Sequence, residues 1–167
     1  KIKASVVQIG PHKINAERFD ENEINNNPFF CGDAKAAIEW ENYLDEIRKK
    51  GSSAGAILEV IATGIPTGIG QPLYGKLDSE IASAMMSINA VKAVEIGAGF
   101  SLSEVPGEVA GDEMQISDGR AEFLSNNAGG ILGGISSGAP ITARVAIKPT
   151  SSILTTRKSI DTDGNNV

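Results

Sequence analysis

Between residues 141 and 148, apolar and other side chains alternate without a break. Ile141, Ala143, Val145 and Ile147 form one series, and the residues that follow them are Thr, Arg, Ala and Lys. Strict alternation is typical of a β-strand with one buried face. Pro149 ends the pattern, because proline has no backbone N–H for a strand ladder. This predicted strand constrains the fold more than any other segment.

Weaker patterns predict two helices and three further strands. Trp40, Leu44 and Ile47 follow helical spacing after Asp33, a suitable N-cap, and basic residues followed by Gly51 end the helix. The other predicted elements are a helix at residues 77–88 and strands at 4–9, 56–63 and 94–100.

Charge balance and the rarity of cysteine and histidine exclude several classes of protein. A net charge of −6 and a pI near 4.8 argue against a general binder of nucleic acids or anionic membranes. Any phosphate-bearing ligand must therefore be held by local donors. Cys31 is the one cysteine, which excludes a disulfide framework and favours a reducing cytosol. His12, the one histidine, is expected to be solvated and excludes a multi-histidine metal site.

Three stretches show no regular period. Residues 17–27 and 101–120 are acidic and are expected to be solvated, and no function is assigned to the second of them. Residues 64–72 are rich in glycine and proline and predict a loop. No stretch resembles a membrane-spanning helix or a secretory signal. Both ends of the chain are expected to have been cut from something longer.

Several motifs come close to known ligand loops without completing them. Residues 70–77 have the glycine and lysine spacing of a P-loop, but Leu77 stands where a magnesium-binding hydroxyl is required. The Gly-x-Gly pairs at 68–70 and 97–99 lack the third glycine of a dinucleotide fingerprint. Residues 161–165 resemble the start of a calcium loop and are expected to form a tight turn.

Two segments are better candidates for binding. Residues 125–138 contain two Gly-Gly pairs flanked by Asn and Ser, so backbone N–H groups and side-chain amides could meet a ligand. Residues 148–152 place one cation and three hydroxyls at the end of a strand, where a phosphate could use all four donors. Taken singly, the first segment is better explained by close packing or a flexible loop, and the second by a solvated strand terminus and turn.

Four blocks of the chain together resemble chorismate synthase. They are GIPTGIGQPLYGKLD at 64–78, MSINAVKAVEIGAGF at 86–100, SNNAGGILGGISSGAPI at 125–141 and KPTSSI at 148–153. The resemblance implies an α+β fold, a β-α-β sandwich in which helices lie between antiparallel sheets. Residues 1–167 would form a single-domain segment from the centre of such a chain.

The resemblance also implies an activity. The family converts 5-enolpyruvylshikimate 3-phosphate to chorismate and phosphate by a 1,4-anti elimination that requires reduced FMN. It implies a cytoplasmic homotetramer that acts on a small phosphorylated substrate, with no nucleic acid or membrane as partner. It leaves open whether the flavin is reduced with NADPH by the enzyme itself or elsewhere, so NADP is a further expectation.

The same motifs carry over a set of flavin-binding residues. They are Asn89, Ala90, Gly133, Lys148, Pro149, Thr150, Ser151 and Ser152. The family's catalytic histidines and its terminal arginine and histidine motifs have no counterpart here, so no catalytic residue is assigned and the isolated segment is expected to be inactive. Residues 51–56 also depart from the family pattern. The alternatives are a non-catalytic binding or assembly module and a general flavoprotein oxidoreductase.

Overall fold

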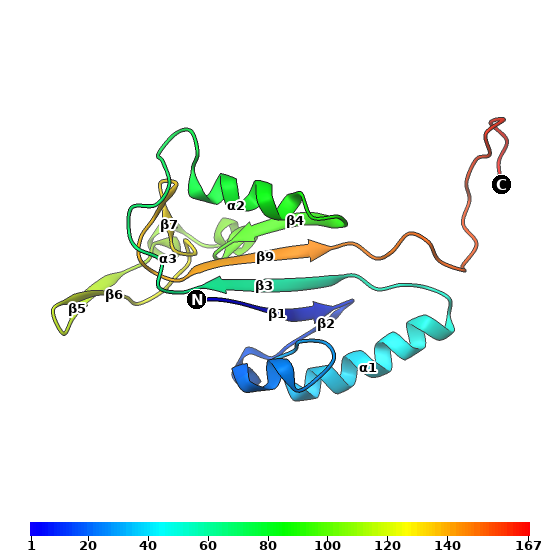
Figure 1. Cartoon of the computed structure of the whole chain (residues 1–167), viewed down its shortest axis with the longest axis horizontal. Helices are drawn as coiled ribbons and strands as arrows, with labels where there is room; N and C mark the ends of the chain where they lie inside the picture. Colours follow the sequence, from blue (N-terminus) through cyan, green and yellow to red (C-terminus); the bar gives the residue numbers. More distant parts are fainter.

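The molecule is built on one antiparallel sheet of five strands (Figure 1). The computed structural model describes residues 1–119 and 121–167 in full, and the backbone of residue 120. The strand order is β2-β1-β3-β9-β4, and every neighbouring pair is antiparallel. The strands are β1 (Ile2–Ile9), β2 (His12–Lys13), β3 (Ala56–Ala62), β4 (Val91–Ile96) and β9 (Ile141–Ile147). The four strands predicted from alternation are therefore confirmed, and so is the α+β class.

Register across the central strands explains the alternation of β9. Arg144 lies between Glu59 of β3 and Glu95 of β4, and its guanidinium is 3.4 Å from the Glu95 carboxylate. The neighbouring residues Ala143 and Val145 point to the other face and are buried. One face of β9 is thus apolar and mostly buried, and on the other face a row of charges formed by Glu59, Arg144 and Glu95 crosses the three strands.

Helix α1 (Ala34–Lys49) packs beside β1 and β2 and forms the best-packed part of the molecule. The Asp33 side chain accepts hydrogen bonds from the N–H groups of Lys35 and Ala36, which confirms the predicted N-cap. Trp40 is fully buried, and its indole N–H donates to the carbonyl of His12 at 3.0 Å. The buried core cluster here consists of Ile9, Cys31, Ala36, Ala37 and Trp40.

The acidic stretch 17–27 is mostly exposed, as expected, and it also contains two short 3₁₀ helices, Ala16–Arg18 and Glu21–Asn25. The side chains of Asn15 and Asp20 cap these helices by accepting hydrogen bonds from the N–H groups of Glu17 and Asn22. His12 lies in β2 and is half-buried, with its ring 4.8 Å from that of Tyr43. A solvated histidine was therefore the wrong expectation.

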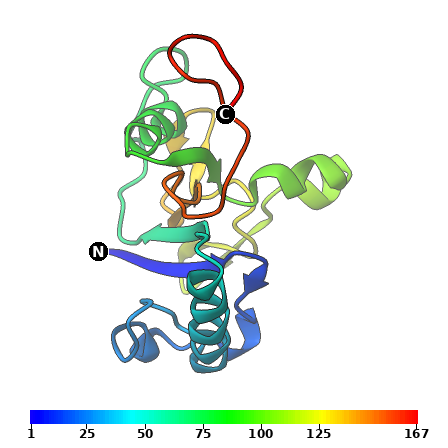
Figure 2. The same cartoon turned by 90° about the vertical axis from the view of Figure 1, so that its right-hand side faces the viewer.

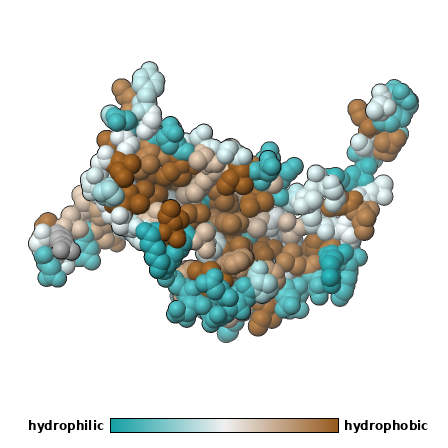
Figure 3. Space-filling model, viewed as in Figure 1, coloured by the Kyte–Doolittle hydropathy of each residue, from teal (hydrophilic) through white to brown (hydrophobic). Residues whose placement is uncertain are grey.

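Helix α2 (Leu77–Met86) lies beside β4, at the edge of the sheet opposite to α1 (Figures 1 and 2). It ends before Ile88, two residues earlier than the apolar spacing predicted. No residue of α2 is buried. Figure 3 shows apolar side chains gathered on the surface over this helix.

The segments between β4 and β9 lie mostly on the surface. Strand β4 stops at Ile96, because Gly97 turns the chain with a φ of +60° into a 3₁₀ helix at Gly99–Glu104. The acidic excursion, residues 101–120, contains regular structure although its sequence shows no regular period. Its elements and those that follow are α3 (Gly107–Ala110), β5 (Met114–Ser117), β6 (Arg120–Phe123), β7 (Ile131–Leu132) and β8 (Ile135–Ser136).

Beyond β9, residues 148–167 form a strap that runs away from the sheet (Figure 1). The predicted tight turn is present, since the Gly164 N–H donates to the Asp161 carbonyl at 3.2 Å. Within the described residues, no helix is long and apolar enough to cross a membrane.

Candidate flavin-binding site

The start of β4 and the end of β9 meet at one corner of the sheet. Val91 pairs with Ile147, and one step further out the Lys148 N–H donates to the Ala90 carbonyl at 2.9 Å. Ala90 has a φ of +71°, an uncommon conformation for a residue with a side chain. The turn at Asn89 and Ala90 is therefore held directly beside Lys148, although 57 residues lie between Ala90 and Lys148 in the sequence.

Asn89 and Lys148 are both exposed at this corner. Among the described residues, Lys148 takes part in no ion pair, so its ammonium group is available to an anion. The corner therefore offers an exposed cation and an exposed side-chain amide on adjoining stretches of backbone, a donor set that suits a phosphate or the polar edge of a heteroaromatic ring.

The strap that follows Lys148 keeps its hydroxyl groups free while its backbone is held. The Ser53 hydroxyl donates to the Thr150 carbonyl at 2.6 Å, and Arg157 donates to the Ser151 carbonyl at 2.7 Å. Within the part of the chain that the structure describes, no hydrogen bond uses the hydroxyls of Thr150, Ser151 or Ser152. Three exposed hydroxyls thus lie next to the cation, as the sequence led us to expect.

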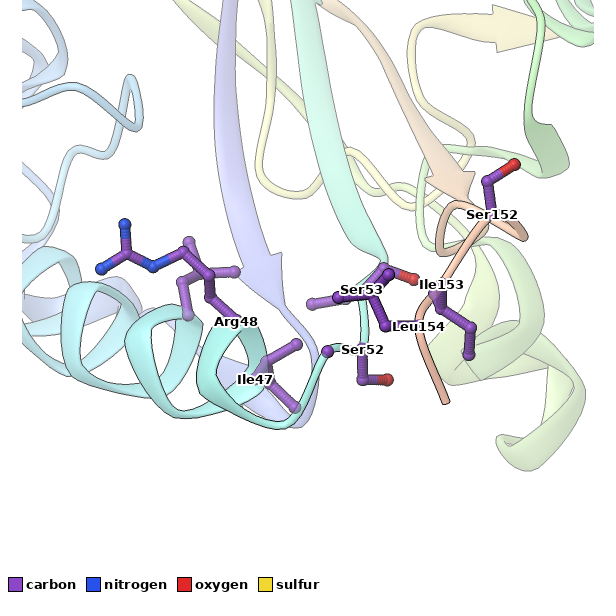
Figure 4. Close-up of a pocket in the computed structure, with 10 residues that line it drawn as sticks. Ile47, Arg48, Ser52, Ser53, Ser152, Ile153 and Leu154 are labelled. Atoms are coloured by element: carbon purple, nitrogen blue, oxygen red, sulfur yellow. The ribbon is translucent and has the colours of Figure 1, made fainter. Parts of the chain in front are cut away.

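A pocket of about 370 Å³ lies between the end of α1 and this strap (Figure 4). A backbone hydrogen bond holds the strap there, since the Leu154 N–H donates to the Gly51 carbonyl at 2.9 Å. Ser152 is the one predicted site residue that lines the pocket, and in Figure 4 the Arg48 side chain points away from it. The lining residues are Leu44, Ile47, Arg48, Gly51, Ser52, Ser53, Ala54, Ser152, Ile153 and Leu154.

Gly133 lies elsewhere, at the tip of the β7–β8 hairpin. Its φ is +57°, and a Cβ added there would meet nothing within 4 Å. The hairpin is joined to the start of α2, where the Leu77 N–H donates to the Gly134 carbonyl at 2.8 Å. Asn89 follows the other end of this helix, whose ten residues span about 15 Å. The structure therefore brings Ala90 next to Lys148, with Asn89 and residues 149–152 adjoining them along the chain, and leaves Gly133 apart.

Most other glycines of this region serve close packing of backbone on backbone. A Cβ on Gly97 would lie 2.2 Å from the Asn127 carbonyl oxygen, and one on Gly130 would lie 2.5 Å from the Pro140 carbonyl oxygen. Gly129 is similarly crowded by Gly97. The close-packing interpretation of residues 125–138 is thus correct for these glycines, and Gly133 is the exception that faces open space.

Asp112 is a residue that sequence reasoning missed, because it lies in an acidic stretch with no assigned function. Its carboxylate accepts hydrogen bonds from the Ser125 hydroxyl at 2.6 Å and from the N–H groups of Asn127 at 2.6 Å and Ala128 at 2.8 Å. Burial by itself would raise the pKa of Asp112, but these hydrogen bonds outweigh it and lower the pKa below its usual value. The acidic excursion is thereby tied to the glycine-rich segment.

The described residues contain no group of three or more His, Cys, Asp or Glu side chains that could hold a metal ion. Cys31 is buried, and burial raises the pKa of its thiol. A buried thiol of raised pKa is a structural group rather than a reactive one.

Comparison with known proteins gives one consistent result. A family model described as chorismate synthase matches residues 1–167. The chain is 62% identical to the chorismate synthase of Sinorhizobium fredii over 167 residues, which cover 99% of this chain and 46% of that protein. It is 60% identical to the enzyme of Agrobacterium fabrum over the same length, with the same coverage of both chains. The chain spans about half the length of the curated relatives it matches.

A solved structure shows the same likeness in three dimensions. A crystal structure of chorismate synthase superposes with a TM-score of 0.84 at 35% sequence identity, over 91% of this chain and 50% of that one. The predicted fold, of the type found in that enzyme, is confirmed.

Proposed function

The chain belongs to the chorismate synthase family, and from this premise we propose that it takes part in the FMN-dependent 1,4-anti elimination of phosphate from 5-enolpyruvylshikimate 3-phosphate. The product would be chorismate, a precursor in aromatic biosynthesis. The observation that carries the proposal is the meeting of the Asn89–Ala90 turn with Lys148, joined by a backbone hydrogen bond of 2.9 Å. Residues far apart in the sequence thereby offer a cation, an amide and three hydroxyls at one corner.

The donor set at this corner fits a flavin nucleotide. Lys148 and the hydroxyls of Thr150, Ser151 and Ser152 would bind the phosphate or the polar ring edge, since none of them has an anionic partner in the described chain. Pro149 fixes the backbone between them. When bound, reduced FMN would supply an electron transiently for loss of the allylic phosphate and would recover it as the ring proton leaves, with no net redox change. The role of these residues is to bind and orient the cofactor.

The position of Gly133 supports a site shared between copies of the chain. Gly133 lies at the far end of α2 from Asn89, and its open surface suits close approach of a flat ring. Because one copy of the chain presents Gly133 and Lys148 at opposite ends of α2, we propose that a flavin in contact with both lies between two copies. This supports the proposal of a homo-oligomer, a tetramer by resemblance.

The net charge of −6 favours an arrangement in which other residues of the enzyme bind the substrate, which carries two carboxylates and a phosphate. We assign no catalytic residue to this chain, and by itself we expect it not to turn over substrate. A cytoplasmic location fits the unpaired, buried Cys31. NADP as the electron source stays a proposal by resemblance.

The test is a titration of reduced FMN, with substrate present, into the protein as its gene encodes it. We expect Lys148→Ala and Asn89→Ala each to weaken binding by about tenfold to 100-fold, because each removes a hydrogen bond to a charged or strongly polar group. Lys158→Ala, an exposed lysine further along the strap, is the matched control. Undiminished affinity in both variants would remove the site assignment.

Gly133 has its own test. Gly133→Ala is expected to weaken flavin binding, while Gly164→Ala, which also has positive φ and open surroundings, leaves it unchanged. Both substitutions carry the same backbone strain of about 1–2 kcal/mol, so a difference in affinity reports contact with the ligand. Equal effects would place Gly133 outside the site.

A second candidate is a non-catalytic binding or assembly module. The observation that favours it is the exposed apolar surface of α2 and the residues after it, where Met86 and Ile88 are 47% and 55% exposed. The mass of the protein purified from its native source separates the two candidates. A native chain limited to these 167 residues would favour the module.

A further inference from the structure

Asp112 is the point at which the acidic excursion contacts the glycine-rich segment. Between residues 111 and 119 it is the one residue that is not exposed. Its Oδ1 accepts from the Ser125 hydroxyl and the Asn127 N–H, and its Oδ2 accepts from the Ala128 N–H. One carboxylate therefore satisfies three donors that precede the first Gly-Gly pair.

The donors belong to a turn that is held from two other sides. The Asn126 side chain accepts from the Gly130 N–H and donates to the Pro140 carbonyl, both at 2.8 Å. The Asn127 carbonyl accepts from the Ala98 N–H at the end of β4, also at 2.8 Å. Asp112 provides the third set of hydrogen bonds, on the side of the turn that faces the acidic excursion.

The turn leads directly into the hairpin that presents Gly133. After Ala128 come the tightly packed Gly129 and Gly130, then the buried Ile131 of β7. The backbone of this run has little freedom to adjust, because Gly129 and Gly130 are packed against other backbone segments. A change in the shape of the turn would therefore also move the hairpin. The direction in which the hairpin leaves the sheet thus depends on the shape of the turn.

We propose that Asp112 is a positioning residue, whose carboxylate holds the turn at 126–130 in the shape that presents Gly133 to the flavin. The effect on flavin rests on the proposed function, whereas the effect on the turn does not. Asp112 itself need not contact the ligand, since its three hydrogen bonds are all made within the chain.

Hydrogen exchange tests the effect on the turn without any ligand. Asp112→Ala removes both acceptors, and we expect the amides of Asn127 and Ala128 to exchange about tenfold faster or more. Asp112→Asn keeps the shape but places an NH₂ group opposite one of these donors, so one amide should be released and the other kept. Asp118→Asn, on the exposed tip of the same excursion, is the matched control and should change neither.

Unchanged exchange at both amides in Asp112→Ala would overturn the proposal. Amides of α1 serve as the check on folding, since this helix lies at the opposite edge of the sheet and should keep its protection in every variant.

Titration of reduced FMN into the same variants, in the protein as its gene encodes it, tests the effect on the flavin. We expect affinity to fall in the order of lost amide protection, with Asp112→Asn between Asp112→Ala and the parent protein. A loosened turn with unchanged flavin affinity would overturn the positioning role. If instead Asn89→Ala and Lys148→Ala leave the affinity unchanged, the flavin-site assignment fails, and the exchange data still decide whether Asp112 holds the turn.

Discussion

The two longer helices differ in burial, and the difference is the reverse of what their composition suggests. Helix α1 is rich in charged residues, yet it buries Ala36, Ala37 and Trp40. Helix α2 carries charges only at Asp78 and Glu80 and buries no residue. What decides burial is the surface opposite each helix, since α1 lies against the end of β1 and its following loops, while α2 meets β4 along one side. An apolar helix surface left uncovered in this way is a place for further contacts.

The largest expected effect is at the centre of the α1 core. Trp40→Ala should lower the free energy of unfolding by about 3–5 kcal/mol, because it leaves a cavity and an unpaired carbonyl at His12. Ile81→Ala in α2, which is half-buried, should cost much less, about 1 kcal/mol. Urea unfolding followed by circular dichroism measures both changes. Tryptophan fluorescence cannot be used, because Trp40→Ala removes the sole tryptophan. Equal losses would show that the two helices are packed alike.

The next effect concerns the cap of α1. Burial alone would raise the pKa of the Asp33 carboxyl, but hydrogen bonds from Arg18, Asn15 and Ala36 outweigh it and lower the pKa to about 2. The ionised carboxylate therefore stabilises the fold fully above the ordinary pKa of 3.8, and this contribution of roughly 2 kcal/mol is lost as the pH falls through 2.

Urea midpoints measured between pH 6 and pH 2 test this for the parent protein and for Asp33→Asn. The variant should be less stable at neutral pH and should show a smaller further loss in acid. Asp45→Asn is the control, because Asp45 makes a solvent-exposed pair with Arg48 and should hardly matter. Parallel pH curves for the parent protein and Asp33→Asn would contradict the assignment.

The smallest effect is expected on the uncovered side of α2. Met86→Gln should change the stability of the isolated chain by less than about 0.5 kcal/mol, because the side chain is 47% exposed. Thermal unfolding of the chain measures this. A loss above about 2 kcal/mol would mean that Met86 is buried in solution, for instance against a second copy, and would remove the contrast with α1.

Local patterns predicted the elements whose signals are complete within a few residues. The alternation of β9 and the N-cap at Asp33 are of this kind, since each depends on neighbours along the chain. His12 was placed wrongly because its partner Tyr43 lies on another element. The role of Asp112 was missed for the same reason, since its donors begin 13 residues further along the chain, at Ser125.

For the candidate site, the family motifs pointed to eight residues, and the fold arranged them. Pairing of β4 with β9 places the Asn89–Ala90 turn next to Lys148, whereas α2 separates both from Gly133. Motifs fix which chemical groups are present, and strand pairing fixes which of them can reach one ligand.

The sequence by itself determined four strands of the main sheet, the capped helix and the family, because alternation, capping and motif order can be read along the chain. Only the tertiary structure decided which glycines are packed and which is open, where Asp112 binds, and which helix is buried. These depend on contacts between segments that are distant in the chain, and the free energy of such contacts is set by distance and burial rather than by residue type alone.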